Sequence, residues 1–99
     1  MTDTTHNGYS NFETWATALW LDNDQGTHEH VKTLVEIVKE EGPRLGDSKI
    51  VRLAMWLEDY VQELLLPEDT PANLASDLLA HSLSRVNWRE MAENYLAED

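Results

Sequence analysis

The side chains best suited to metal or acid–base chemistry in this sequence are four histidines and several adjacent carboxylates. His28 and His30 stand two positions apart in the run GTHEHV. Side chains two positions apart on a helix point in directions about 160–200° apart, so they do not converge on one ion. His6 falls in the N-terminal tail, and His81 is alone on its predicted helix. We therefore expect no metal site and no cofactor.

Other routes to catalysis lack the residues that they need. The chain has no cysteine, no serine in a Gly-x-Ser-x-Gly turn, and no glycine-rich loop with a lysine for phosphate. Glu58 and Asp59 are a carboxylate pair, but adjacent residues on a helix spread across its solvent face and do not meet. We expect a protein that is not an enzyme.

The charge of the chain narrows the choice of partners. Nineteen Asp and Glu stand against seven Lys and Arg, which gives a net charge of −12. Such a field repels nucleic acid and anionic membranes and attracts basic proteins. No apolar run approaches the roughly 18–20 residues that span a bilayer, and the N-terminus lacks a signal-peptide pattern. We expect a cytoplasmic protein that binds a basic protein surface, with no direct nucleic-acid or membrane binding.

Several acidic residues occupy helix positions where a negative charge lowers the stability of the helix. The C-terminal end of a helix carries partial negative charge, so a carboxylate there costs about 0.3–1 kcal/mol. Glu36 and Glu40 also stand one turn apart, which places like charges side by side. Three explanations stay open: solubility, adaptation to high salt, or imitation of the phosphate row of DNA, which carries about one charge per 1.7 Å. The acids at or just beyond predicted helix C-termini are Asp22, Glu40, Glu41, Glu63, Glu98 and Asp99.

The aromatic stretch NGYSNFETWATALWLDND, residues 7–24, fits either a binding site or the first helix of a core. Its helical spacing favours the core for most of its apolar residues. Trp20 differs because it lies about 140° around the helix from Trp15, so both rings cannot enter one small core. A protruding Trp20 beside Asp22 and Asp24 would suit a protein-binding hot spot. The residues predicted to share the buried face are Phe12, Trp15, Ala16 and Leu19.

Five helices are predicted to position these residues. A capping box of Ser10 and Glu13 begins the first helix, which runs to about Asp22. Thr27 is the predicted N-cap of the second helix, and Gly42-Pro43 ends it. The predicted buried stripe of this second helix is Val31, Leu34, Val35 and Val38.

The third helix is predicted to be the longest, from Asp47 or Ser48 to about Leu66, with Trp56 and Tyr60 broadening its apolar face. Thr70-Pro71 begins the fourth helix and Asn87 with Glu90 begins the fifth. The predicted stripes are Ile50, Leu53, Ala54, Leu57, Val61 and Leu64 on the third helix, Leu74, Leu78, Leu79 and Leu83 on the fourth, and Trp88, Met91, Ala92, Tyr95 and Leu96 on the fifth. The sequence therefore predicts an all-α, compact single-domain bundle of about five helices over residues 10–99, after a flexible tail at 1–9.

Both ends of the chain resemble small proteins of unassigned function that phages, plasmids and archaea encode. In these proteins an N-terminal Asn-Gly-aromatic-x-Asn-aromatic-Glu-Thr-Trp motif is followed by Leu-Trp, as in residues 7–15 and 19–21 here, with Asn23-Asp24 beyond. The ending VNWREMAENYLAED is similar to their usual close, and the two ends cover about a third of the chain. This resemblance implies a setting in mobile genetic elements. By size, charge and setting, the chain is also similar to anti-restriction and anti-CRISPR proteins.

Two functional hypotheses follow. The first is an inhibitor that binds the basic surface of a nucleic-acid-binding host defence complex, by DNA mimicry or by blocking the access of DNA. The second is a structural or regulatory helical module that self-associates, as a homodimer for example, through an apolar face on the third helix. The residues predicted to contact the partner are Trp20, Asp22, Asp24, Glu36, Glu40, Glu41, Glu58, Asp59 and Glu63.

Overall fold

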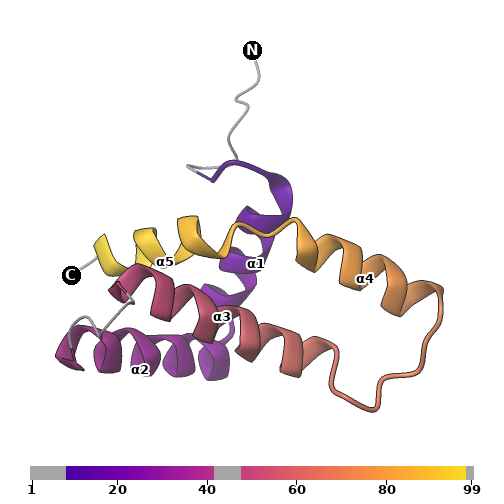
Figure 1. The fold of residues 1–99 in the computed structure, drawn as a ribbon, viewed down its shortest axis with the longest axis horizontal. Coiled ribbons are helices and arrows are strands. Elements are labelled where there is room, and N and C mark those ends of the chain that lie inside the picture. Colours follow the sequence, from indigo (N-terminus) through magenta and orange to yellow (C-terminus); the bar gives the residue numbers. More distant parts are fainter. Residues whose placement is uncertain (1–8, 42–47, 98–99) are drawn as a thin grey trace.

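Polar caps and breaks in the apolar pattern divide the chain into helices. The computed structural model describes residues 9–41 and 48–97, and these form five α-helices (Figure 1). The predicted all-α class is therefore confirmed. The helices are α1 at Phe12–Asn23, α2 at Gln25–Glu41, α3 at Lys49–Leu65, α4 at Leu74–Ser84 and α5 at Trp88–Ala97.

Some sequence predictions fall on other parts of the chain. Tyr9, the last residue of the predicted tail, is partly buried against the core. The remainder of that tail, Gly42-Pro43, Asp47, Glu98 and Asp99 lie outside the described residues.

The start of α1 differs from the prediction. Asn11 is the N-cap, and its side chain accepts the backbone N–H of Thr14 at 2.8 Å. The predicted local capping box is wrong, because the backbone N–H and Oγ of Ser10 both donate to Oε1 of Glu90, at 3.0 and 2.9 Å. Glu13 pairs instead with Arg85, at 3.3 Å. A tertiary partner has replaced the local partner in each half of the box.

The starts of α2 and α4 also move. Asp24 caps α2 by accepting the N–H of Thr27 at 3.0 Å, so Thr27 lies inside the helix and is not its cap. Asn73 caps α4 in a reciprocal box with Ser76. Thr70 does not cap this helix, because its N–H and Oγ1 both donate to the carbonyl of Pro67 in the preceding turn. Ser48 caps α3 as predicted.

The two ends of the chain that carry the resemblance meet in space. Asn87, the residue before α5, donates its N–H to Oγ1 of Thr14 at 2.8 Å. The side-chain amide of Asn11 donates to the carbonyl of Arg85 at 2.8 Å. These contacts tie the first turn of α1 to the first turn of α5. We call this set of residues the α1–α5 clasp: Ser10, Asn11, Glu13, Thr14, Arg85, Asn87 and Glu90.

The clasp also sets which face of α1 is buried. Thr14 must face α5 to accept the Asn87 N–H, so the buried residues of α1 are Thr14, Ala18 and Leu21. The predicted face was wrong for Phe12 and Leu19, which are 55% and 40% exposed. The most deeply buried face of α1 is therefore the one that carries the hydrogen bond between Thr14 and Asn87.

Helix α3 lies at the centre and makes its most extensive helix contact with α5. Leu53 and Leu57 of α3 and Met91 of α5 are fully buried, as predicted. The predicted stripe of α5 is confirmed, with Leu96 partly buried at its edge. The buried Arg52 joins the two long helices through an ion pair with Glu41 at 3.2 Å.

Helix α4 projects from the body together with the distal half of α3, to which residues 66–73 connect it (Figure 1). Leu83 is buried, but Leu74 and Leu78 are 74% and 60% exposed. Leu64 of α3 is 53% exposed. The predictions that placed these three leucines in the core were wrong, because α4 makes only slight contact with the other described helices.

Candidate functional site

Trp20 is the most prominent feature of the predicted site, with 74% of its surface exposed. Its ring stands beside an apolar hollow of about 370 Å³ between α1 and the distal half of α3. We call Trp20, Leu64, Leu65 and the hollow between them the Trp20 face. The residues that line the hollow are Ala16, Thr17, Trp20, Leu21, Asp24, Thr27, Val61, Leu64 and Leu65.

The end of α3 supplies the wall of this hollow. Val61 is buried, whereas Leu64 and Leu65 are 53% and 44% exposed. Sequence reasoning assigned Leu64 to the core and did not single out Leu65. The run Leu64-Leu65-Leu66 held a usable signal, because three consecutive helical residues point in three directions about 100° apart and cannot all enter one core.

The polar edge of the Trp20 face is formed by Asp24. Its Oδ1 accepts the Thr27 N–H at 3.0 Å, which fixes the carboxylate at the junction of α1 and α2. Burial and, to a smaller extent, the charge of Asp24 raise the pKa of Tyr60 above its ordinary value of 10.0. His30 stacks on Tyr60 with ring centroids 4.0 Å apart. Negative potential from Asp24 thus reaches the ring of Tyr60.

Carboxylates border a second hollow at the end of α3. Asp59 and Glu63, two of the predicted site residues, lie one turn apart and line this hollow of about 550 Å³ together with Glu68. The sequence did not single out Glu68, because its position depends on the turn that follows α3. Glu58 is partly buried and accepts a hydrogen bond from the Gln62 side chain at 3.3 Å. The structure therefore groups Asp59 with Glu63 and leaves Glu58 apart.

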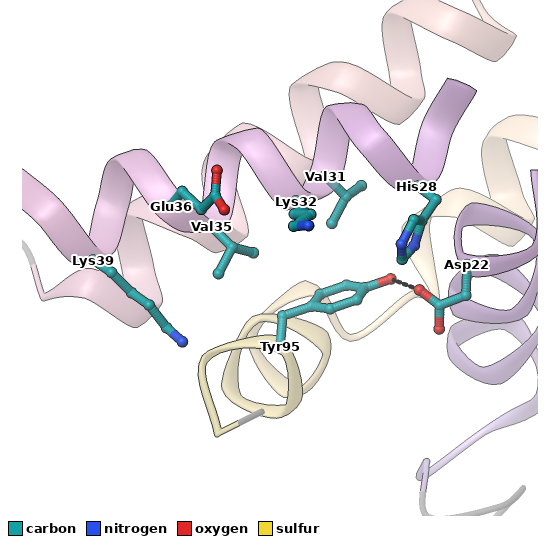
Figure 2. Close-up of a pocket in the computed structure, with 8 residues that line it drawn as sticks. All are labelled: Asp22, His28, Val31, Lys32, Val35, Glu36, Lys39 and Tyr95. Carbon is teal, nitrogen blue, oxygen red and sulfur yellow. Dashed lines mark hydrogen bonds between the residues drawn. The ribbon is translucent and has the colours of Figure 1, made fainter. Parts of the chain in front are cut away.

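The remaining predicted acids lie elsewhere. Glu36 and Glu40 are exposed on α2 and border a shallow hollow with Lys39. Glu41 pairs with Arg52, as described above. Asp22 accepts the hydroxyl hydrogen bond of Tyr95 at 2.8 Å in a groove between α2 and α5 (Figure 2). The nine predicted residues therefore do not form one surface.

In residues 9–41 and 48–97, no three histidine or carboxylate side chains gather closely enough to hold a metal ion. Within the same ranges, none of the helices combines the length and apolarity that crossing a bilayer demands.

The comparisons with known proteins identify a family and nothing more specific. Residues 2–95 match the family model described as "Family of unknown function (DUF7249)". No curated protein and no solved structure matches the chain.

Proposed function

The chain belongs to DUF7249, a family of unknown function, and we propose that it is an inhibitor that binds the basic surface of a nucleic-acid-binding host defence complex. The observation that carries this proposal is the Trp20 face, where an exposed tryptophan stands beside an apolar hollow. Tryptophan is enriched at the centres of protein interfaces because it buries a large area and loses little conformational freedom. An inhibitor of this kind is not an enzyme and acts by occupying its target.

Charge supports a basic partner for this face. Asp24 lies at its edge, and Asp59, Glu63 and Glu68 occupy the same end of α3 as Leu64 and Leu65. With a net charge of −12, the protein is steered towards cationic surfaces and away from nucleic acid. A binding surface that evolved for DNA offers such cations.

We favour blocking the access of DNA over imitation of DNA. An apolar anchor such as Trp20 has no counterpart on the phosphate backbone, and the predicted acids are divided between separate hollows. Carboxylates at the end of α3 would approach the cations of the target while Trp20 enters an apolar pocket beside them. The setting in mobile genetic elements that the resemblance implies supports a target in host defence.

Matched variants test this proposal. We expect Trp20→Ala and Asp59→Asn/Glu63→Gln each to abolish protection of phage or plasmid DNA in restriction and CRISPR interference assays. Glu36→Gln/Glu40→Gln is the control, because it also removes two charges but from another surface. Direct binding to the purified complex should fall in parallel with protection. The proposal fails if the chain protects against neither system, or if the α2 control impairs protection as strongly as the α3 variant.

A second candidate is self-association through α4, and one observation favours it. Leu74 and Leu78 stand one turn apart on α4 and are 74% and 60% exposed. Between Asp69 and Glu90 the chain has a single acidic residue, Asp77, so copies can approach there with the least repulsion. Sedimentation velocity separates the candidates: Leu74→Ser/Leu78→Ser should abolish a salt-insensitive dimer if α4 forms it. A strictly monomeric wild type at high protein concentration excludes this candidate.

A further inference from the structure

A groove between α2 and α5, closed at one end by Asp22 of α1, has the construction of a small-molecule site. Its volume is about 520 Å³, within the range of about 300–1,000 Å³ typical of ligand pockets. Figure 2 shows the side chains that line it. They are Asp22, His28, Val31, Lys32, Val35, Glu36, Lys39 and Tyr95.

Basic side chains follow the groove along one stripe of α2. His28, Lys32, Val35 and Lys39 are spaced at i, i+4, i+7 and i+11, so they lie on one face of the helix. Two of the seven Lys and Arg in the chain thus line a single groove of a protein with a net charge of −12. The stripe is therefore basic, although the molecule as a whole is strongly acidic.

Lys32 differs from the arginines in how its charge is balanced. Each arginine of the described residues pairs with a glutamate: Arg52 with Glu41, Arg85 with Glu13 and Arg89 with Glu93. Lys32 forms no ion pair with a described residue, although Glu36 lies one turn away. Its ammonium group is therefore available to an anion from outside.

The floor of the groove is apolar, and its aromatic ring has a fixed orientation. Val31 and Tyr95 are only 3% and 8% exposed, and Val35 is partly buried. The Tyr95 hydroxyl donates to Asp22 at 2.8 Å, which holds the ring in place. Asp22 and Lys39 lie at opposite ends of the groove, with Lys32 between them (Figure 2). Among the described residues that line the groove, the carboxylates are Asp22 at one end and Glu36 on the rim.

We propose that this groove binds a small amphipathic anion: an anionic head group contacting Lys32, joined to an apolar ring or short chain that lies on Tyr95, Val31 and Val35. The apolar part supplies affinity through burial, and Lys32 selects the charge of the head group. This site uses neither Trp20 nor the carboxylates of α3, so it is independent of the proposed function.

The test uses the full chain and the probe 8-anilinonaphthalene-1-sulfonate, which combines a sulfonate with apolar rings. We expect saturable fluorescence enhancement and amide shifts, in ¹⁵N NMR spectra, that centre on Val31, Lys32, Val35 and Tyr95. Lys32→Glu should weaken binding of the probe by about tenfold, as expected for loss of a charge-assisted contact. Lys49→Glu is the matched control, because it makes the same charge change at the start of α3, outside the groove.

Competition then defines the ligand class. Decanoate and decyl phosphate should both displace the probe, and the stronger of the two identifies the preferred head group. Decyltrimethylammonium and citrate should not displace the probe, because the first lacks an anionic head group and the second lacks an apolar chain. The proposal is overturned if the amide shifts centre on Thr17 and Leu64, if Lys32→Glu and Lys49→Glu have equal effects, or if the decyl cation competes as well as the decyl anions. Unchanged NMR spectra confirm that both variants fold.

Discussion

Thr14 shows how one polar side chain can orient a helix. It is fully buried, and its hydroxyl accepts the N–H of Asn87 from the start of α5. With this contact in place, Thr14 faces α5, whereas Phe12 and Leu19 lie on the exposed side of α1.

We expect Thr14→Val to lower the free energy of unfolding by about 1–3 kcal/mol, because the shape is kept while the acceptor for Asn87 is lost. Thr14→Ser should keep most of the stability. Thr17→Val is the matched control, since the Thr17 hydroxyl only donates to the Glu13 carbonyl within the same helix. Urea unfolding followed by tryptophan fluorescence measures all three. Equal losses for Thr14→Val and Thr17→Val would contradict this role for Thr14.

Tyr60 reports on the electrostatics beside the Trp20 face. Its pKa is raised above 10.0 by burial and by the charge of Asp24, so the folded state favours the neutral phenol. Below pH 10 the phenol is neutral in both states and its contribution is constant. Above pH 10 the unfolded chain ionises first, so stability falls as pH rises towards the pKa of the folded state.

We expect Asp24→Asn to lower the pKa of Tyr60 and to weaken this alkaline loss of stability, because the smaller of the two causes is removed. The difference in tyrosinate absorbance between the protein and its Tyr60→Phe variant measures the pKa. Asp77→Asn on α4 serves as the control, since it removes one charge on a different helix. An unchanged Tyr60 titration in Asp24→Asn would show that Asp24 does not act on this ring.

The described helices differ in how extensively they pack against the rest of the protein. α5 is tied to α1 by the clasp and packs along α3, whereas α4 is anchored mainly through Leu83. Local stability follows the number of buried contacts, so α4 should open without the rest of the molecule.

The same substitution at two N-caps tests this difference. Asn87→Ala removes the acceptor of the Glu90 N–H and should lower the global free energy of unfolding by about 0.5–2 kcal/mol. Asn73→Ala removes the acceptor of the Ser76 N–H and should mainly accelerate hydrogen exchange in α4, with little global change. Hydrogen-exchange NMR of both variants distinguishes local from global effects. Equal global losses would mean that α4 is an integral part of the cooperative core.

The sequence predicted the helices better than their contacts. Apolar spacing correctly assigned α5 and the centre of α3, because Met91 and Leu57 have no alternative to the core. The cap at Ser10 was wrong because side-chain type does not reveal a tertiary competitor such as Glu90. The cap at Thr27 was wrong because Asp24, an equally good N-cap three residues earlier, begins the helix before it. The lining of the Trp20 face was only partly predictable: the angle of Trp20 around its helix indicated exposure. The exposure of Leu64 and Leu65 was not predictable, because it depends on where the distal half of α3 extends beyond its neighbouring helices.

The net charge of −12 destabilises the compact state through self-repulsion. Asp59 and Glu63 stand one turn apart on α3, and Glu63 lies in the last turn, where the helix dipole disfavours it as well. Their presence at these positions agrees with a role in binding, since local stability does not require them.

We therefore expect added sodium chloride to raise the free energy of unfolding, because screening relieves repulsion more than it weakens the exposed ion pairs. At low salt, Glu63→Gln should stabilise the protein by about 0.5–1 kcal/mol, and the gain should shrink as salt is added. Glu36→Gln is the control: Glu36 lies within one turn of both Lys32 and Lys39, so its removal should give no gain. Urea unfolding at several salt concentrations measures each effect. A fall in stability with salt would mean that favourable ion pairs outweigh the repulsion, and the acids of α3 would then need no functional explanation.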